Sequence, residues 1–124
     1  MADFKIEKIN TIIIPVKDLD KSIDFYKNTL NLTEDSVENG MAYFSVGKGE
    51  SKINVMLHII DKPEPVEKGI VFELITDDVD SAVESIKNAG GEIVQEPVDR
   101  EWGVKEAVIA DPDGYRIWID QPLS

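Results

Sequence analysis

Few side chains of this 124-residue chain could do chemistry, and their types favour ligand binding. His58 is the only histidine and could hydrogen-bond a ligand or accept a proton. Glu73 interrupts the apolar stretch VFELI, where a buried carboxylate needs a cationic partner or ligand. Trp118, in RIWID, offers a flat surface for stacking on an aromatic or cationic molecule. The chain has no cysteine, which excludes thiol nucleophiles, thiolate metal sites and disulfide bonds.

Each of these side chains also has a purely structural interpretation. His58 could be a polar residue without a role, and Trp118 could simply fill space. Glu73 could pair with Arg116, or either side chain could contact a ligand. A general-base role for Glu73 or His58 is a further alternative. Trp102, in DREWG, could lie at the rim of a pocket, on a bare surface or in a dimer interface.

The elements that must position these residues occur twice in the same order. Apolar, β-branched runs predict buried strands, and apolar residues spaced three or four apart predict helices. The first half is expected to contain a strand at 9–16, a helix at 19–30 begun by Asp18 or Asp20, and strands at about 34–38, 41–46 and 52–60. The second half is expected to contain a strand at 69–76, a helix at 79–89, and strands at about 92–97, 104–110 and 115–120.

Turn signals separate these elements. Asn39-Gly40 predicts a two-residue hairpin, and Gly90-Gly91 is typical of a helix end. The DPDG segment at 111–114 fits a type I turn; its two aspartates could chelate calcium, but such a segment is usually only a turn. The charged, proline-containing segment 61–68 is interpreted as a linker. We therefore expect one domain over 1–124, with module 1 at about 8–60 and module 2 at about 69–121.

The two halves also match in sequence at an offset of sixty residues. DLD at 18–20 falls on DVD at 78–80, and Leu57 and Ile59 fall on Ile117 and Ile119. This offset makes Thr11 the counterpart of Val71 and His58 the counterpart of Trp118.

Side chains alternate between the two faces of a strand, so each sheet has a second face opposite its helix. Two curved sheets side by side would join these second faces into a concave cup, with the mixed apolar and polar lining of a ligand pocket. The residues expected on the cup, or at its rim in the case of Trp102, are Thr11, Met56, His58, Glu73, Trp102, Arg116 and Trp118.

Two segments resemble a known superfamily. VKDLDKSIDFYKNTL at 16–30 looks like the opening of the vicinal oxygen chelate superfamily, and DPDGYRIWIDQ at 111–121 resembles its closing hairpin. That superfamily includes glyoxalase I, extradiol dioxygenases, fosfomycin-resistance enzymes and bleomycin-binding proteins. The resemblance extends over about 9–121 and implies an α+β fold of two βαβββ modules that form a cup. It does not select one activity, because this fold hosts several chemistries.

In metal-dependent members, ligands come from the first and last strands of each module. Carried over by resemblance, the four positions here are Thr11, His58, Val71 and Trp118, of which only His58 is a competent ligand. A catalytic metal takes about three N or O ligands from the protein. An alternative strand register, with Met56 at the second position, would weaken the functional interpretation of His58. We therefore expect no metal and no cofactor, as in the drug-binding members, which are homodimers.

The formal net charge of −12 bears on possible partners. Such a surface repels phosphate backbones and anionic membranes and attracts cationic ligands. The N-terminus has no signal-peptide pattern, and no apolar run reaches the roughly 20 residues that span a bilayer. We expect a soluble cytoplasmic protein.

Three hypotheses about function remain at this stage. The first is a homodimeric binding protein that sequesters a small organic molecule, aromatic or cationic, such as a drug. The second is a lyase, isomerase or dioxygenase with unusual metal ligands or acid–base chemistry through His58 and Glu73. The third is a structural or regulatory subunit whose cup is filled core. A pocket of roughly 300 Å³ or more beside Trp118 would argue against the third.

Overall fold

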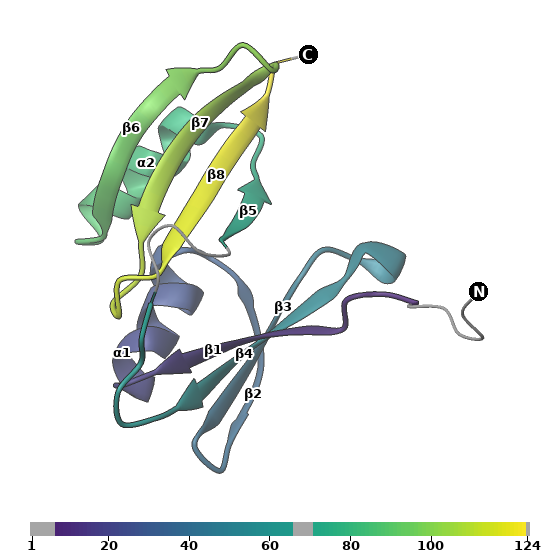
Figure 1. Cartoon of the computed structure of the whole chain (residues 1–124), viewed down its shortest axis with the longest axis vertical. Helices are drawn as coiled ribbons and strands as arrows, with labels where there is room; N and C mark the ends of the chain where they lie inside the picture. The colour runs from purple at the N-terminus through teal and green to yellow at the C-terminus, as the bar shows by residue number, and fades with distance from the viewer. Residues whose placement is uncertain (1–6, 66–70, 124) are drawn as a thin grey trace.

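A computed structural model describes residues 7–65 and 71–123, which form two βαβββ modules (Figure 1). The first contains β1 (Thr11–Val16), α1 (Leu19–Asp24) with a π-helical turn (Phe25–Thr29), β2 (Thr33–Glu38), β3 (Met41–Val46), a 3₁₀ turn (Gly49–Ser51) and β4 (Ile53–Ile59). The second contains β5 (Phe72–Ile75), α2 (Val79–Asn88), β6 (Glu92–Asp99), β7 (Val104–Ala110) and β8 (Arg116–Pro122).

Each module is one four-stranded sheet, with strand orders β1-β4-β3-β2 and β5-β8-β7-β6. The first and last strands of each module are parallel, and the other neighbours are antiparallel. The predicted α+β fold with two βαβββ modules is confirmed. Residues 66–70, which include part of the predicted linker and the start of the predicted strand at 69–76, lie outside the described residues.

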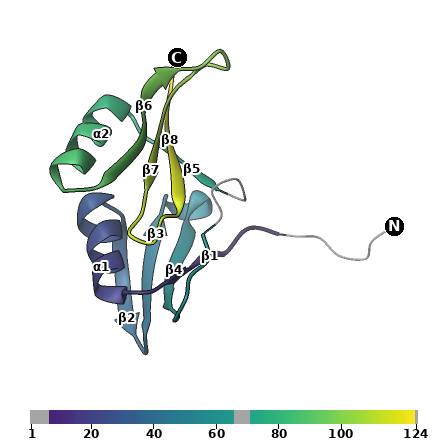
Figure 2. The same ribbon diagram turned by 60° about the vertical axis from the view of Figure 1, so that its left-hand side comes forward.

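Both helices cover the same side of the two sheets and leave the other side open (Figure 2). The buried side chains on the helix side form one core that extends through both modules. In α2 this buried stripe consists of Val79, Val83 and Ile86. No helix in the described part of the chain has the length and apolar character needed to cross a bilayer.

The helix N-termini are capped at equivalent places in the two modules. Asp18 Oδ1 accepts the backbone N–H of Lys21 at 3.1 Å, which selects Asp18 over Asp20 as the cap. Asp78 Oδ1 accepts the N–H of Ser81 at 3.1 Å, and its Oδ2 accepts the Ser81 hydroxyl at 2.8 Å. These hydrogen bonds lower the pKa of Asp78.

The DPDG turn is more than a turn, because it fastens module 2 to module 1. The Tyr26 hydroxyl donates to Asp111 Oδ2 at 2.7 Å from the buried side of the first helix. Asp111 Oδ1 accepts the backbone N–H groups of Asp113 and Tyr115 at 3.0 and 2.8 Å. Asp113 Oδ1 accepts the N–H of Lys17 at 3.2 Å. The carboxylates that could have bound calcium therefore hydrogen-bond protein donors instead.

The sixty-residue offset holds for the first strands but is wrong for the closing strands. Ile13 lies opposite Met56, and Glu73 lies opposite Trp118. The paired residues are 56 − 13 = 43 residues apart in module 1 and 118 − 73 = 45 apart in module 2. Because the helix caps Asp18 and Asp78 keep the offset of sixty, the closing strands correspond at an offset of 62. Two additional residues between the paired strands of module 2 cause the shift. Side chains alternate between the two faces of a strand with a period of two residues, so a shift of two leaves each side chain on its original face.

This register corrects two sequence-based assignments. Met56, and not His58, is the counterpart of Trp118, as the alternative register anticipated. Leu57 and Ile59 do not correspond to Ile117 and Ile119; Val55 and Leu57 do, with the same offset of 62.

Candidate functional site: carboxyl groups on the open face of the second sheet

The open face of the second sheet brings together four charged or aromatic side chains from three strands. The register places Glu73 beside Trp118 and Trp118 beside Val108. In the next row Ile75 lies beside Asp120, and Asp120 beside Glu106. Alternation along each strand puts both rows on the same face.

Two of the carboxyl groups are buried although they lie on the open side. Asp120 is 0% exposed and Glu106 is 3% exposed. Glu106 Oε1 accepts the Arg100 Nε–H at 3.1 Å, and Arg100 Nη2 donates to Gln95 Oε1 at 3.0 Å. Among the described residues, neither Asp120 oxygen nor Glu106 Oε2 has a conventional hydrogen-bond donor. Burying carboxylates without hydrogen-bond donors destabilises the folded state, so the presence of this cluster needs an explanation.

The protonation of Asp120 follows from these neighbours. Burial raises the pKa of Asp120 to about 7, helped by the neighbouring carboxyl groups of Glu73 and Glu106. The positive charge of Arg100 acts in the opposite direction. Near neutral pH Asp120 therefore changes between its protonated, neutral form and its negatively charged form.

The sequence-predicted residues of module 2 partly converge on this cluster. Glu73 is exposed, and Trp118 beside it is 37% exposed. Arg116 lies two residues before Trp118 on the same face, and its Nη1 donates to the Gly114 carbonyl at 3.1 Å. The predicted Glu73–Arg116 ion pair stays a prediction.

Trp102 lies in the β6–β7 turn and is 67% exposed. The Arg100 guanidinium lies 5.7 Å from the centre of its ring, within cation–π range. Since Arg100 also contacts Glu106, Trp102 borders the charged cluster through this arginine.

The predicted residues of module 1 are dispersed along their strands. Thr11 lies opposite Asn54 at one end of β1, and His58 lies opposite Pro15 at the other. These pairs are four positions apart along the strands, a distance of about 13 Å. His58 is exposed, so it does not occupy the floor of a cup, while Met56 lies between the two ends and is partly buried.

Sequence reasoning missed Glu106, Asp120 and Arg100 as members of the cluster. A signal was present, because Glu106 in VKEAVIA interrupts an apolar strand as Glu73 does in VFELI. Alternation from Trp118 puts Asp120 on the same face, but only the packing shows that its carboxyl group is buried.

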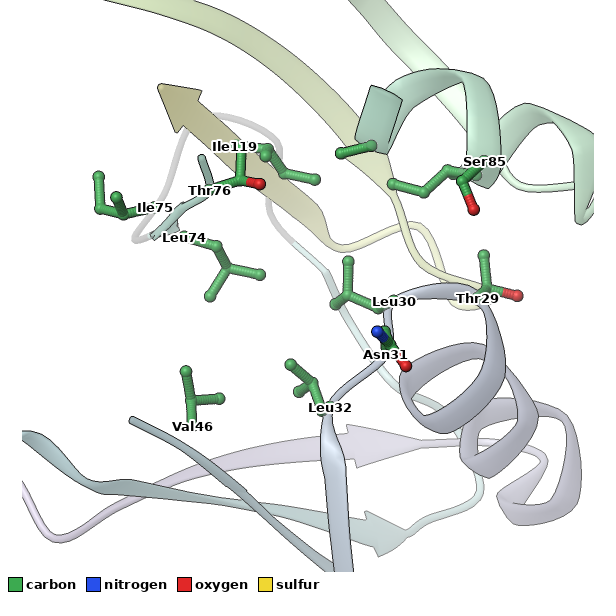
Figure 3. A pocket seen from close by; sticks show the side chains of 12 residues that line it. Thr29, Leu30, Asn31, Leu32, Val46, Leu74, Ile75, Thr76, Ser85 and Ile119 are labelled. Carbon is green, nitrogen blue, oxygen red and sulfur yellow. The ribbon is translucent and has the colours of Figure 1, made fainter. Parts of the chain in front are cut away.

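A separate hollow of about 290 Å³ lies between the modules (Figure 3). It is lined mainly by apolar side chains, with Thr29, Asn31, Thr76 and Ser85 at its polar positions. Leu30 and Leu32 approach it from module 1, and Leu74 and Ile119 from module 2. Trp118 does not line this hollow, so it is not the pocket expected beside that residue.

The residues present do not fit the metal that the family resemblance implies. With the observed register the four positions are Thr11, Met56, Val71 and Trp118. Valine and tryptophan side chains supply no ligand atom, and a hydroxyl and a thioether are weak ligands for first-row metals. Within residues 7–65 and 71–123, no three side chains of His, Asp or Glu are grouped to hold a metal ion.

Comparisons with known proteins agree with the fold. The chain is 30% identical over 127 residues to the uncharacterized protein YraH of Bacillus subtilis, covering 94% of this chain and 99% of that protein. It is 30% identical over 122 residues to a lactoylglutathione lyase of Neisseria meningitidis, covering 90% and 88%. Among solved structures, TnmS3, an antibiotic binding protein from Streptomyces sp. CB03234, superimposes with a TM-score of 0.75 at 26% identity over 96% of this chain and 98% of that one.

A glyoxalase/bleomycin resistance protein/dioxygenase from Nocardioides superimposes with the same TM-score of 0.75 at 21% identity, over 98% of this chain and 87% of that one. Residues 8–119 match the sequence profile of one superfamily. The chain therefore belongs to the Glyoxalase/Bleomycin resistance protein/Dioxygenase superfamily.

Proposed function

We propose that this protein is a metal-free, cytoplasmic homodimer that binds a small organic molecule, aromatic or cationic, on the open face of its second sheet. The observation that carries the proposal is the half-exposed Trp118 close to buried Asp120, whose carboxyl oxygens accept no hydrogen bond from the described residues. A flat apolar surface beside an uncompensated carboxyl is the arrangement that recognises such molecules.

Three further facts support this proposal. The four family ligand positions carry side chains unsuited to a first-row metal. A structural neighbour, TnmS3, is described as an antibiotic binding protein. On the edge strands of the open side, Ile13 is 58% exposed and Ile75 is 63% exposed, as apolar residues of a subunit contact would be in an isolated chain.

The second candidate is an enzyme of the same superfamily, a lyase, isomerase or dioxygenase that uses unusual metal ligands or acid–base chemistry through Glu73 and His58. It is favoured by the 30% identity to proteins named lactoylglutathione lyase. Against it stands the separation of the two residues, since Glu73 is on the second sheet and His58 is exposed at the end of β4 on the first.

Two measurements on the tag-free protein separate these candidates. The first is metal content after incubation with nickel, zinc, manganese and iron(II) and desalting. The second is a screen of aromatic amines and cationic drugs by tryptophan fluorescence, with an assay for turnover of lactoylglutathione alongside. Ligand binding with a metal content near zero supports the binding protein. A metal content near one per chain together with turnover would overturn it in favour of the enzyme.

A further inference from the structure

We propose that the hollow between the modules is a second binding site, which takes an uncharged bicyclic aromatic molecule with one hydrogen-bonding group. The hollow lies on the helix side of both sheets, because Val46, Leu74 and Ile119 line it with side chains that pack in or against the core. It is therefore separate from the open face that carries Trp118, and the inference goes beyond the proposed function without resting on it.

The volume of the hollow sets the size of the ligand. At about 290 Å³ it lies near the lower limit for pockets that bind small molecules. An apolar cavity that binds benzene has roughly half this volume, about 150 Å³. Two fused aromatic rings therefore match the space, and a drug of ordinary size exceeds it.

The lining continues the hydrophobic core to the surface. Ile86 and Ile119 line the hollow although each is only 3% exposed, because both belong to the core. Partly buried side chains from both modules complete this apolar surface around a central opening (Figure 3): Leu30, Leu32, Val46 and Leu74. Water in contact with such a surface is released when an apolar molecule covers it, which favours binding.

The charges around the hollow decide the charge of the ligand. Although 31% of the residues of the chain are charged, none of the described residues that line the hollow is. A charged group that entered would lose hydration without gaining an opposite charge. The net charge of −12 would disfavour an anion further. The site therefore favours a neutral molecule.

Asn31 and Ser85 supply the hydrogen-bonding groups of the site. Asn31 follows the π-helical turn, Ser85 lies on α2, and the two side chains lie on the same side of the hollow (Figure 3). Within the described residues, neither side chain forms a hydrogen bond to the protein. An amide and a hydroxyl can each donate and accept, so together they suit a single phenol, carbonyl or amide group of a ligand.

The backbone holds the wall from module 1 in place. The Leu30 N–H donates to the Phe25 carbonyl at 2.7 Å, which closes the π-helical turn. The Leu32 N–H donates to the Tyr26 carbonyl at 2.8 Å. Asn31 between them has φ = 66°, and this left-handed residue lets Leu30 and Leu32 both reach the hollow. Turns of the π type are frequent at functional sites.

An NMR titration of the full chain tests the site with 2-naphthol, which is uncharged at pH 7. We expect saturable shifts of the methyl signals of Leu30, Leu32 and Leu74, and no comparable shift of the Trp118 indole N–H. Naphthalene-2-carboxylate and 2-naphthylmethylamine are its anionic and cationic counterparts. Each should bind at least about tenfold more weakly than 2-naphthol.

Two substitutions with matched controls examine the site itself. Ser85→Phe, at an exposed position of α2, should fill the hollow and weaken 2-naphthol binding at least about tenfold. Glu84→Phe, at the neighbouring exposed position outside the hollow, should not. Asn31→Gly keeps the left-handed backbone and should weaken 2-naphthol about three- to tenfold without weakening naphthalene. Asn39→Gly, at an asparagine with φ = 51° outside the hollow, should change neither affinity.

Several outcomes would overturn the inference. They are the absence of saturable shifts at the three leucines, equal affinity for 2-naphthol and either charged counterpart, and unchanged binding by Ser85→Phe. If Ser85→Phe does not fold, Asn31→Gly decides, because equal affinity changes for 2-naphthol and naphthalene would contradict the assigned hydrogen bond. Shifts at the Trp118 indole in place of the leucines would put 2-naphthol on the open face, which supports the proposed function and rejects the second site.

Discussion

At the scale of single residues, the most unusual feature of this protein is a buried aspartate whose oxygens accept no hydrogen bond from the described residues. Asp120 contributes nothing to core packing, because it faces the open side of the sheet while Ile117 and Ile119 on the same strand fill the core. Buried groups of this kind lower stability and are common where a protein binds something. The free energy by which buried Asp120 destabilises the folded state should therefore be measurable.

We predict that Asp120→Asn changes how stability depends on pH. The pKa of Asp120 is about 7 in the folded protein, against 3.8 for an ordinary aspartate, so only the folded state holds the proton between these values. The resulting stabilisation is complete below about pH 4 and is lost as the pH rises through 7. Asparagine should remove this loss and make the protein more stable than the unmodified chain at pH 8, by on the order of 1 kcal/mol because nearby solvent screens the charge.

Urea unfolding at pH 5 and pH 8 measures this effect. Asp99→Asn on the exposed end of β6 serves as the control and should leave the difference between the two pH values unchanged. Equal pH dependence in the unmodified protein and in Asp120→Asn would show that Asp120 titrates as an ordinary aspartate.

At the scale of elements, the hydrogen bond from Tyr26 ties the first helix to the β7–β8 turn. The Tyr26 hydroxyl is fully buried, and burial together with the charge of Asp111 raises its pKa, so it remains a donor in neutral solution. We predict that Tyr26→Phe lowers the free energy of unfolding by about 1–3 kcal/mol, because it leaves a buried Asp111 oxygen without its donor.

The control for this substitution is Tyr43→Phe. Among the described residues, the Tyr43 hydroxyl hydrogen-bonds to the Met41 sulfur alone, at 3.6 Å, so its removal should cost less than about 0.5 kcal/mol. Chemical denaturation of both variants compares the two costs directly, and equal values would mean that the link between the modules contributes nothing.

The connection from α2 to β6 supports a second prediction at this scale. Gly90 has φ = 86°, and a Cβ added there would lie in open space. A Cβ added to Gly91 would lie 2.5 Å from Ile86 Cγ2. The two glycines are therefore needed for different reasons, conformation in one and close packing in the other. Gly90→Asn should cost well under 1 kcal/mol, and Gly91→Ala about 1–3 kcal/mol. Thermal unfolding of the two variants would contradict this account if their order were reversed.

The sequence predicts these elements well and the contacts between them poorly. Strand β3, strand β7 and the start of both helices follow directly from alternation, turn residues and capping aspartates. The first helix differs from expectation, because its second half is a π-helical turn closed by the bond from Leu30 N–H to the Phe25 carbonyl at 2.7 Å. Apolar spacing does not distinguish a π turn from an α turn over five residues.

The candidate site shows the same limit. The face of each strand residue is fixed by the period of two, so Glu73, Trp118 and Asp120 could be grouped from the sequence. Which parallel register joins β5 to β8, and which carboxyl the packing buries, depends on contacts 45 residues apart along the chain between Glu73 and Trp118. An offset measured on the helices could not reveal the two additional residues that displace His58 from the position of Met56.

At the scale of the whole molecule, both helices lie on one side, and the other side presents edge strands with exposed isoleucines (Figure 2). In the proposed homodimer a second copy covers these edges, since exposed apolar residues on edge strands invite pairing. We predict that Ile13→Lys, on β1, shifts the protein from dimer to monomer, because it would bury an unpaired charge in the contact. Sedimentation velocity at micromolar concentration measures the change.

Val37→Lys is the matched control for this substitution. Val37 is 49% exposed on β2, the opposite edge of the first sheet, and should tolerate the charge without loss of the dimer. The net charge of −12 adds a second requirement, because two such subunits repel each other at low ionic strength. The dimer of the unmodified protein should therefore tighten as salt rises from about 10 to 150 mM. A protein that sediments as a monomer at both salt concentrations would show that the open face is not a subunit contact.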